Sequence, residues 1–184
     1  MDPEPILILL VESINIWLVF SVIALFILLI CSALISGTEV AFFSMSQTEL
    51  NKAAESKFNT QKLVVKLLEN PQKVLATILI ANNFVNVGIV ILSTFITAEL
   101  FNLGEFPVLA FIIQVVVITS LILFVGEILP KVYSTQRPIG FAGKMSQPLR
   151  FLMRLFYPLS LFLVKSTNII DRRITNRGLQ ISRS

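Results

Sequence analysis

Three long apolar runs dominate this chain, and each carries a polar interruption. They cover residues 14–35, 74–100 and 108–132. At about 1.5 Å of rise per residue, each run is long enough as a helix to cross a hydrocarbon core of about 30 Å. With 55% hydrophobic residues, 14% charged residues and a mean hydropathy of +0.83, the chain is too apolar for a soluble domain of its size. The sequence therefore predicts an all-α integral membrane protein with three transmembrane helices.

The stretches outside the runs predict helices at a membrane surface. Residues 45–73 mix lysine and glutamate with leucine at helical spacing. We expect a helical hairpin on the cytoplasmic side, broken near residues 58–60 and ended by Asn70-Pro71. Beyond residue 133, basic and apolar residues alternate. A fourth span there would be interrupted by Arg150, Arg154 and Pro158, so an interfacial helix or a shallow re-entrant pair is favoured.

These elements define the expected domain boundaries. Residues 1–165 form a transmembrane domain, with an uncleaved N-terminal lead-in and a basic juxtamembrane belt at about 139–165. Its spans are expected at about 14–42, 74–101 and 107–133. Residues 166–184 are expected to form a basic helical linker that leads to a cytosolic domain outside this chain.

The basic residues predict how the chain is oriented. All 15 Lys and Arg lie within residues 45–73 or after Glu127. Because cytoplasmic segments of membrane proteins are enriched in Lys and Arg, this predicts an N-terminus outside and a cytoplasmic C-terminus. The expected location is the cell inner (plasma) membrane, with the lipid bilayer as a partner. The placement of the charges also argues against nucleic acid binding, despite the net charge of +4.

The reactive side chains narrow the possible chemistry. The chain has no histidine and one cysteine, Cys31, so an intramolecular disulfide and a soft-metal cluster are excluded within it. A nucleophile and base pair is not evident, and we do not expect an enzyme. Hydroxyl, amide and carboxylate oxygens remain, and they are the ligands that hard cations such as Mg²⁺ and Na⁺ prefer.

An acidic residue in the third run points to a cation site. A bare carboxylate at the centre of a membrane costs about 2.5–3.5 kcal/mol on insertion scales, so Glu127 requires a partner. Counting residues places Glu39, Asn83 and Glu127 at a similar depth toward the cytoplasmic half. A helix unwound at Gly37 or Gly126 would add backbone carbonyls, and the set could surround Mg²⁺ at about 2.0–2.1 Å. The candidate ligands are Ser36, Gly37, Glu39, Ser44, Asn82, Asn83, Asn86 and Glu127.

Structural roles compete with ligation at several of these positions. Ser36 and Gly37 can serve as small residues at a helix crossing, and Asn82 and Asn83 can hydrogen-bond across helices. Glu39 can be protonated, or it can pair with Lys131 near the same interface. These alternatives stay open at the level of the sequence.

Segments 36–44, 81–86 and 126–131 resemble the three signature segments of the CNNM/CorC transmembrane domain family. They occur in the same order with similar spacing, and the resemblance covers roughly residues 14–160. It implies a homodimer with three transmembrane helices per subunit, and Mg²⁺ export driven by Na⁺ entry. Transferred to this sequence, the family's ligands would include Ser36, Asn83 and Glu127, supported by Gly37, Ser44 and Asn86.

Members of that family usually continue into cytosolic CBS modules that bind ATP with Mg²⁺. We therefore expect ATP to act only through a CBS domain that is absent from this chain. Relatives are also linked to bacterial gliding machinery. The alternative function is thus a non-transporting membrane scaffold or Mg²⁺ sensor in a bacterial surface or gliding-type complex.

Overall fold

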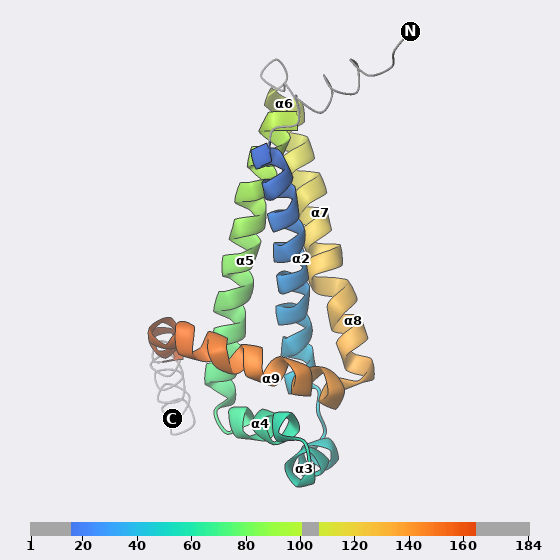
Figure 1. Cartoon of the computed structure of the whole chain (residues 1–184), viewed down its shortest axis with the longest axis vertical. Helices are drawn as coiled ribbons and strands as arrows, with labels where there is room; N and C mark the ends of the chain where they lie inside the picture. The colour runs from blue at the N-terminus through green and yellow to red at the C-terminus, as the bar shows by residue number, and fades with distance from the viewer. Residues whose placement is uncertain (1–15, 101–106, 165–184) are drawn as a thin grey trace, which may run out of the picture. The chain divides into compact units, whose positions relative to one another are not determined.

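The computed structural model describes residues 16–100 and 107–164 (Figure 1). The expectations for the N-terminal lead-in and for the linker at 166–184 lie outside these residues. The described part of the chain is helical and contains no strand, so the all-α prediction is confirmed. The elements are α2 (Ile16–Phe43), α3 (Gln47–Glu55), α4 (Asn59–Leu68), α5 (Pro71–Leu100), α6 (Pro107–Ile112), η2 (Ile113–Ile118), α7 (Thr119–Leu121), η3 (Ile122–Ile128), α8 (Leu129–Gln136) and α9 (Pro138–Leu155).

Three stretches of the described chain are long and apolar enough to cross a membrane. They are Ile16–Phe43, Pro71–Glu99 and Val115–Gln136. Few residues within them are buried in the protein, and large apolar side chains such as Trp17 and Phe26 are more than 60% exposed. Such surfaces suit a lipid environment, because a soluble protein rarely exposes extended apolar patches. The three predicted spans are confirmed, and α9 is not among them.

The third span contains two π-helical segments, η2 and η3. A π-helix bonds each N–H to the carbonyl five residues earlier, and Leu129 donates its N–H to Phe124 in this way. The next residue, Pro130, has no N–H to donate, which suits a change in the bonding pattern at this point. The helix is therefore widened at Gly126, and α2 runs without a break through Gly37. The unwound helix considered from the sequence at Gly37 or Gly126 is therefore not observed.

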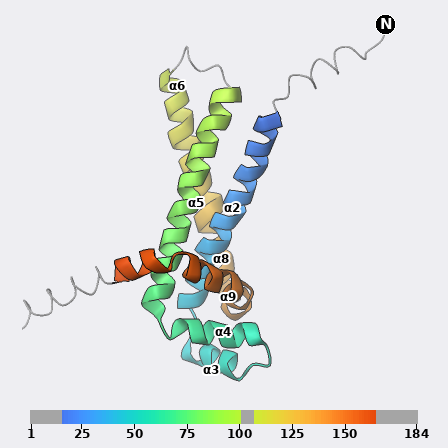
Figure 2. The same ribbon diagram turned by 60° about the vertical axis from the view of Figure 1, so that its left-hand side comes forward.

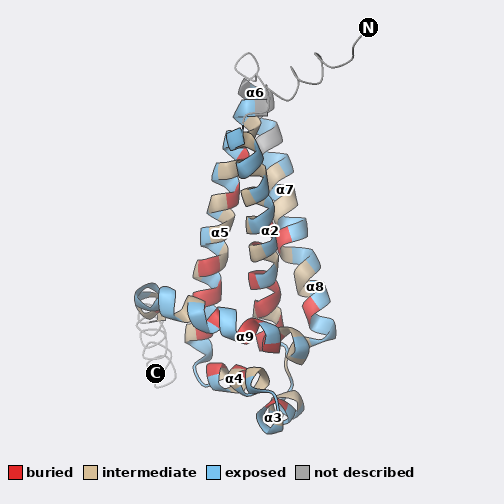
Figure 3. Ribbon diagram, in the orientation of Figure 1, coloured by how far each residue is buried: buried red, intermediate tan, exposed pale blue. Residues whose placement is uncertain are grey.

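The chain divides into two compact units. The first unit combines Met1–Leu34 with Phe84–Pro130, and the second combines Ile35–Asn83 with Lys131–Ser184. Burial differs between them: in Figure 3, buried residues are frequent in the second unit and sparse along the helices of the first. The protein core thus lies mainly in the second unit, where side chains from α2, α4, α5 and α9 are buried.

The predicted helical hairpin is present in the second unit, with its break at residues 56–58. Ser46 caps α3: its hydroxyl accepts the Glu49 N–H, and the Glu49 carboxylate accepts the Ser46 N–H. The Ser46 N–H and the Ser46 hydroxyl both donate to the Glu49 carboxylate, and these two bonds lower the pKa of Glu49 below its ordinary value of 4.5. The hairpin ends where α5 begins at Pro71, whose fixed φ suits a first helical turn.

Helix α4 packs along α9, as Figure 2 shows. Val64 and Leu67 of α4 are buried, as are Ala142, Met145 and Leu149 of α9. Both helices are amphipathic, so one face of each joins the core and the other carries lysine and arginine. This is the juxtamembrane belt expected from the sequence, and a further helical stretch at 157–164 continues it.

Candidate functional site

A chain of hydrogen bonds links three helices within the first unit. Ser32 on α2 donates its hydroxyl to Asn86 Oδ1 on α5, with 2.8 Å between the oxygens. Asn86 in turn donates from Nδ2 to Oε1 of Glu127 on η3 at 3.2 Å. Ser32 is fully buried, and Asn86 and Glu127 are half-buried. We call these three side chains the polar triad. The triad gathers a carboxylate, an amide and a hydroxyl between apolar helices.

The glycine beside Glu127 allows this close approach. A Cβ added at Gly126 would lie 2.9 Å from the Ser32 hydroxyl oxygen, closer than real Cβ contacts come. That hydroxyl is buried and already bonded to Asn86, so it has little room to move. Gly126 is therefore needed where η3 passes α2, as small residues are at many membrane helix crossings.

The second predicted carboxylate has a different partner. In the second unit, Glu39 Oε2 lies 3.2 Å from Lys131 Nζ, and both side chains are about 40% exposed. The alternative that Glu39 pairs with Lys131 is thus confirmed. A pair this exposed contributes little stability, typically about 0–1 kcal/mol, because water competes with both partners.

The other predicted ligands also belong to the second unit. Ser36 and Gly37 are buried in α2, while Ser44 is exposed just after that helix ends. Asn82 is half-buried, and Asn83 is exposed and donates its Nδ2 to the Leu79 carbonyl of its own helix at 2.8 Å. Of the eight predicted residues, the structure therefore joins Asn86 and Glu127 by a hydrogen bond within one unit.

Ser32 was not among the predicted residues. A serine within an apolar run is common, because its hydroxyl can bond to the helix's own backbone, so the residue type alone gives no signal. A clue was its spacing, since Ser32 lies four residues before Ser36 and hence near the same face of one helix. Ser32 joins the candidate site on the strength of its contact with Asn86.

The donor set of the triad suits a hard cation. It offers a carboxylate, an amide oxygen and a hydroxyl, which are oxygen ligands that Mg²⁺ and Na⁺ accept. Within residues 16–100 and 107–164, no three Asp, Glu, Cys or His side chains gather into a metal-binding group. A cation at the triad would therefore rely on one carboxylate and on neutral oxygens.

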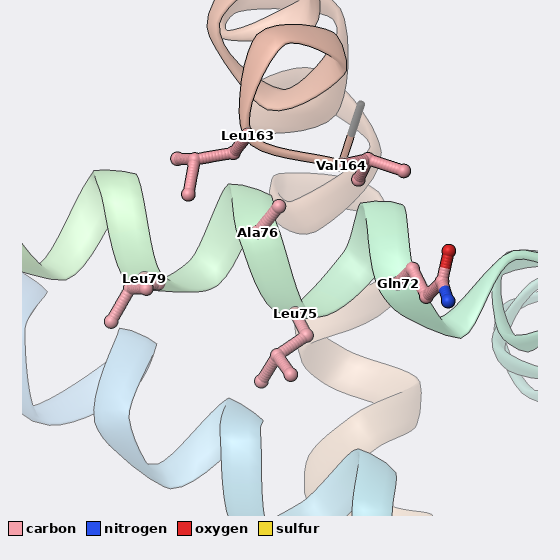
Figure 4. A pocket seen from close by; sticks show the side chains of 6 residues that line it. All are labelled: Gln72, Leu75, Ala76, Leu79, Leu163 and Val164. Atoms are coloured by element: carbon pink, nitrogen blue, oxygen red, sulfur yellow. The ribbon is translucent and has the colours of Figure 1, made fainter. Parts of the chain in front are cut away.

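An apolar pocket in the second unit offers a contrast. Figure 4 shows it between the beginning of α5 and the helical stretch at 157–164. It has a volume of about 150 Å³, and Gln72 is the polar residue of its lining, beside five apolar residues: Leu75, Ala76, Leu79, Leu163 and Val164. The side chains of this lining offer one amide oxygen, whereas hard cations such as Mg²⁺ and Ca²⁺ take about six or more oxygen ligands.

Comparison with known proteins identifies the family. Residues 23–183 match the family described as the Cyclin M transmembrane N-terminal domain. The chain belongs to this family. The match covers most of the first span, all of the other two spans and the juxtamembrane helices, so the resemblance of the three signature segments to this family is confirmed.

Relatives in bacteria and animals support the assignment. A UPF0053 protein of Haemophilus influenzae is 33% identical over 137 residues, covering 74% of this chain and 31% of the relative. Metal transporter cnnm-4 of Caenorhabditis elegans is 32% identical over 144 residues, covering 76% of this chain and 30% of the relative. UPF0053 inner membrane protein YfjD of Escherichia coli is 30% identical over 143 residues, covering 78% of this chain and 31% of the relative. The chain thus spans about a third of the length of these relatives.

Proposed function

We propose that this chain is the transmembrane domain of a divalent-cation transporter, with Mg²⁺ as the transported ion. The polar triad of Ser32, Asn86 and Glu127 carries the proposal, because it links one carboxylate and two neutral oxygen donors across three helices. The name of the nematode relative, a metal transporter, supports the same class of substrate.

Each member of the triad has a distinct part in this proposal. Glu127 supplies the negative charge that draws a cation into an apolar environment. Asn86 holds the carboxylate through its N–H group. When a cation takes the place of that hydrogen bond, the amide turns over, so that its carbonyl oxygen leaves the Ser32 hydroxyl and faces the ion. Ser32 orients the amide through its donated hydrogen bond and adds a hydroxyl oxygen. Ser36, Asn82 and Asn83, which lie in the second unit, stay predictions from the sequence.

The driving force and the topology belong to the same proposal. Na⁺ entry is the proposed counter-ion flux, which the family resemblance implies. The proposed N-terminus lies outside and the C-terminus in the cytoplasm, because the basic residues gather in the hairpin and after Glu127. A homodimer in the plasma membrane, with ATP sensed by a CBS domain outside this chain, completes the proposal.

The first test is the melting temperature of the detergent-purified chain at increasing Mg²⁺ concentration. The native chain and Glu127→Gln are compared side by side. The control is Glu39→Gln, which removes the carboxylate that pairs with Lys131. A bound ion stabilises the folded state by about 2.7 kcal/mol at roughly 100 times its Kd. We expect a saturable rise that Glu127→Gln loses and Glu39→Gln keeps, with potassium chloride of equal ionic strength as the salt control.

The competing function is a membrane scaffold, in which the same hydrogen bonds serve only to hold the helices together. A scaffold of this kind has no reason to respond to Mg²⁺. An absent response, or one that Glu127→Gln retains, would therefore reject the cation site and favour the scaffold. A positive response justifies flux measurements in liposomes, where Mg²⁺ movement with and without a Na⁺ gradient tests the coupling.

A further inference from the structure

A groove lined by basic side chains runs between α4 and α9 in the second unit. Two adjoining hollows of about 480 and 350 Å³ form it, and they share Leu63, Lys66 and Arg150 in their linings. We call this the basic groove. Its cationic residues are Lys62, Lys66, Lys73, Arg150 and Arg154.

The charge of the groove is strongly unbalanced. One carboxylate, Glu69, lines it beside the five cations, and the other polar lining residues are Asn59, Asn70, Gln147 and Tyr157. Within the described ranges 16–100 and 107–164, none of the five cations forms an ion pair with a carboxylate. Like charges that line one groove repel one another, so an anion bound in the groove would be favoured.

Apolar side chains accompany the cations along α9. Phe151 and Leu155 each follow a groove arginine by one position, and they are 65% and 58% exposed. Because successive helical residues are about 100° apart, the apolar pair forms a stripe beside the stripe of Arg150 and Arg154. A ligand that fits this surface combines a negative group with a hydrocarbon portion.

We propose that the basic groove binds the headgroup of an anionic phospholipid, whose acyl chains lie along the apolar stripe of α9. Charge complementarity favours a phosphate at Lys66 and Arg150, which face the groove from different helices. The neighbouring apolar residues favour a lipid over a free phosphate, since a soluble anion gains nothing from Phe151 and Leu155. The chain already carries three helices suited to a bilayer, so such lipids are present at high local concentration.

The test uses the detergent-purified chain and measures its melting temperature during titration with lipid. The probes are phosphatidylglycerol, phosphatidylcholine with the same acyl chains, and glycerol phosphate. The groove variant combines Lys66→Gln with Arg150→Gln. The control variant combines Lys57→Gln with Lys144→Gln, which removes the same charge at exposed positions outside the groove lining.

We expect saturable stabilisation by phosphatidylglycerol that exceeds the effect of the other two probes. In the groove variant, the apparent affinity should fall roughly 30-fold. Each juxtamembrane charge strengthens binding by a factor of about five, and the variant loses two of them. The control variant should keep the affinity of the native chain. Lys62→Gln alone serves as a milder groove variant if the double change impairs folding, and a several-fold loss is expected from it.

Three outcomes would overturn the proposal. Equal losses in the groove and control variants would mean general surface attraction in place of a defined site. Equal stabilisation by glycerol phosphate would make the ligand a soluble anion. No stabilisation by phosphatidylglycerol would leave the groove to another partner, such as an acidic protein segment. The cation site is tested by Mg²⁺ titration and the lipid site by lipid titration, so either proposal can fail without affecting the other.

Discussion

Two glutamates, one in each unit, are held in different ways. Glu127 receives an amide hydrogen bond from Asn86, which is itself fixed by a buried serine. Glu39 lies against the ammonium group of Lys131, with both side chains about 40% exposed. Glu127 is thus joined to a neighbouring span by a hydrogen bond from an amide, whereas Glu39 is joined to Lys131 by an ion pair between opposite charges.

Replacing Gly126 with alanine should break the first arrangement and have the largest effect. The new Cβ would meet the Ser32 hydroxyl at 2.9 Å and force α2 and η3 to shift. We expect a loss of about 2–3 kcal/mol of stability, at the upper end for overpacked sites, together with loss of the Mg²⁺ response. Thermal or denaturant unfolding measures the change. Gly140→Ala is the control. Apart from its chain neighbours and the backbone of its own helix, nothing lies within 4 Å of the added Cβ, so the melting temperature should not fall.

Comparing Asn86 with Asn83 tests which asparagine supports Glu127. Asn86→Leu removes both hydrogen bonds of the triad and should cost about 1–2 kcal/mol. Asn83→Leu removes one bond within its own helix at an exposed position, so its stability should stay within about 0.5 kcal/mol of the native chain. Unfolding of both variants measures this, and equal losses would contradict the assignment. Loss of the Mg²⁺ response in Asn83→Leu would add Asn83 to the cation site.

Two buried serines on different helices of the first unit test whether the hydrogen bond of Ser32 stabilises the protein. Ser32→Ala removes a hydrogen bond between helices and should cost about 0.6 kcal/mol. Ser93 is 1% exposed, and its hydroxyl has no hydrogen-bond partner among the described residues. Ser93→Ala should therefore leave the stability unchanged or raise it, because an unpaired buried hydroxyl is unfavourable. A larger loss from Ser93→Ala than from Ser32→Ala would contradict the hydrogen-bond pattern.

The ion pair of the second unit should give the smallest effect. A double-mutant cycle with Glu39→Gln and Lys131→Gln measures the interaction between the two side chains. We expect a coupling free energy of about 0.5 kcal/mol that decreases with added salt, since both groups are partly exposed. A coupling of several kcal/mol would mean that Glu39 is as firmly held as a buried charge, and the contrast with Glu127 would disappear.

Much of the fold could be read from local sequence, because its causes are local. The three spans follow from apolar length, and the hairpin follows from its helical spacing, with the break expected near residues 58–60 and found at 56–58. The capping box of α3 needs only Ser46 and Glu49. The pairing of Glu39 with Lys131 was one of the open alternatives, and opposite charges expected near the same interface were enough to raise it.

The sequence by itself determined that this is a three-span membrane domain of a known family, with Glu127 as a carboxylate within the third span. Only the tertiary structure decided which polar side chains meet that carboxylate. Asn83 and Asn86 are three residues apart on α5, and the rotation of the helix, fixed by packing, brings Asn86 to Glu127. The π-helical turns of the third span also take extra residues, so its register cannot be counted from a period of about 3.6. The contact between Ser32 and Asn86 could likewise be found only in the structure, because contacts between helices depend on packing and rotation that no single segment encodes.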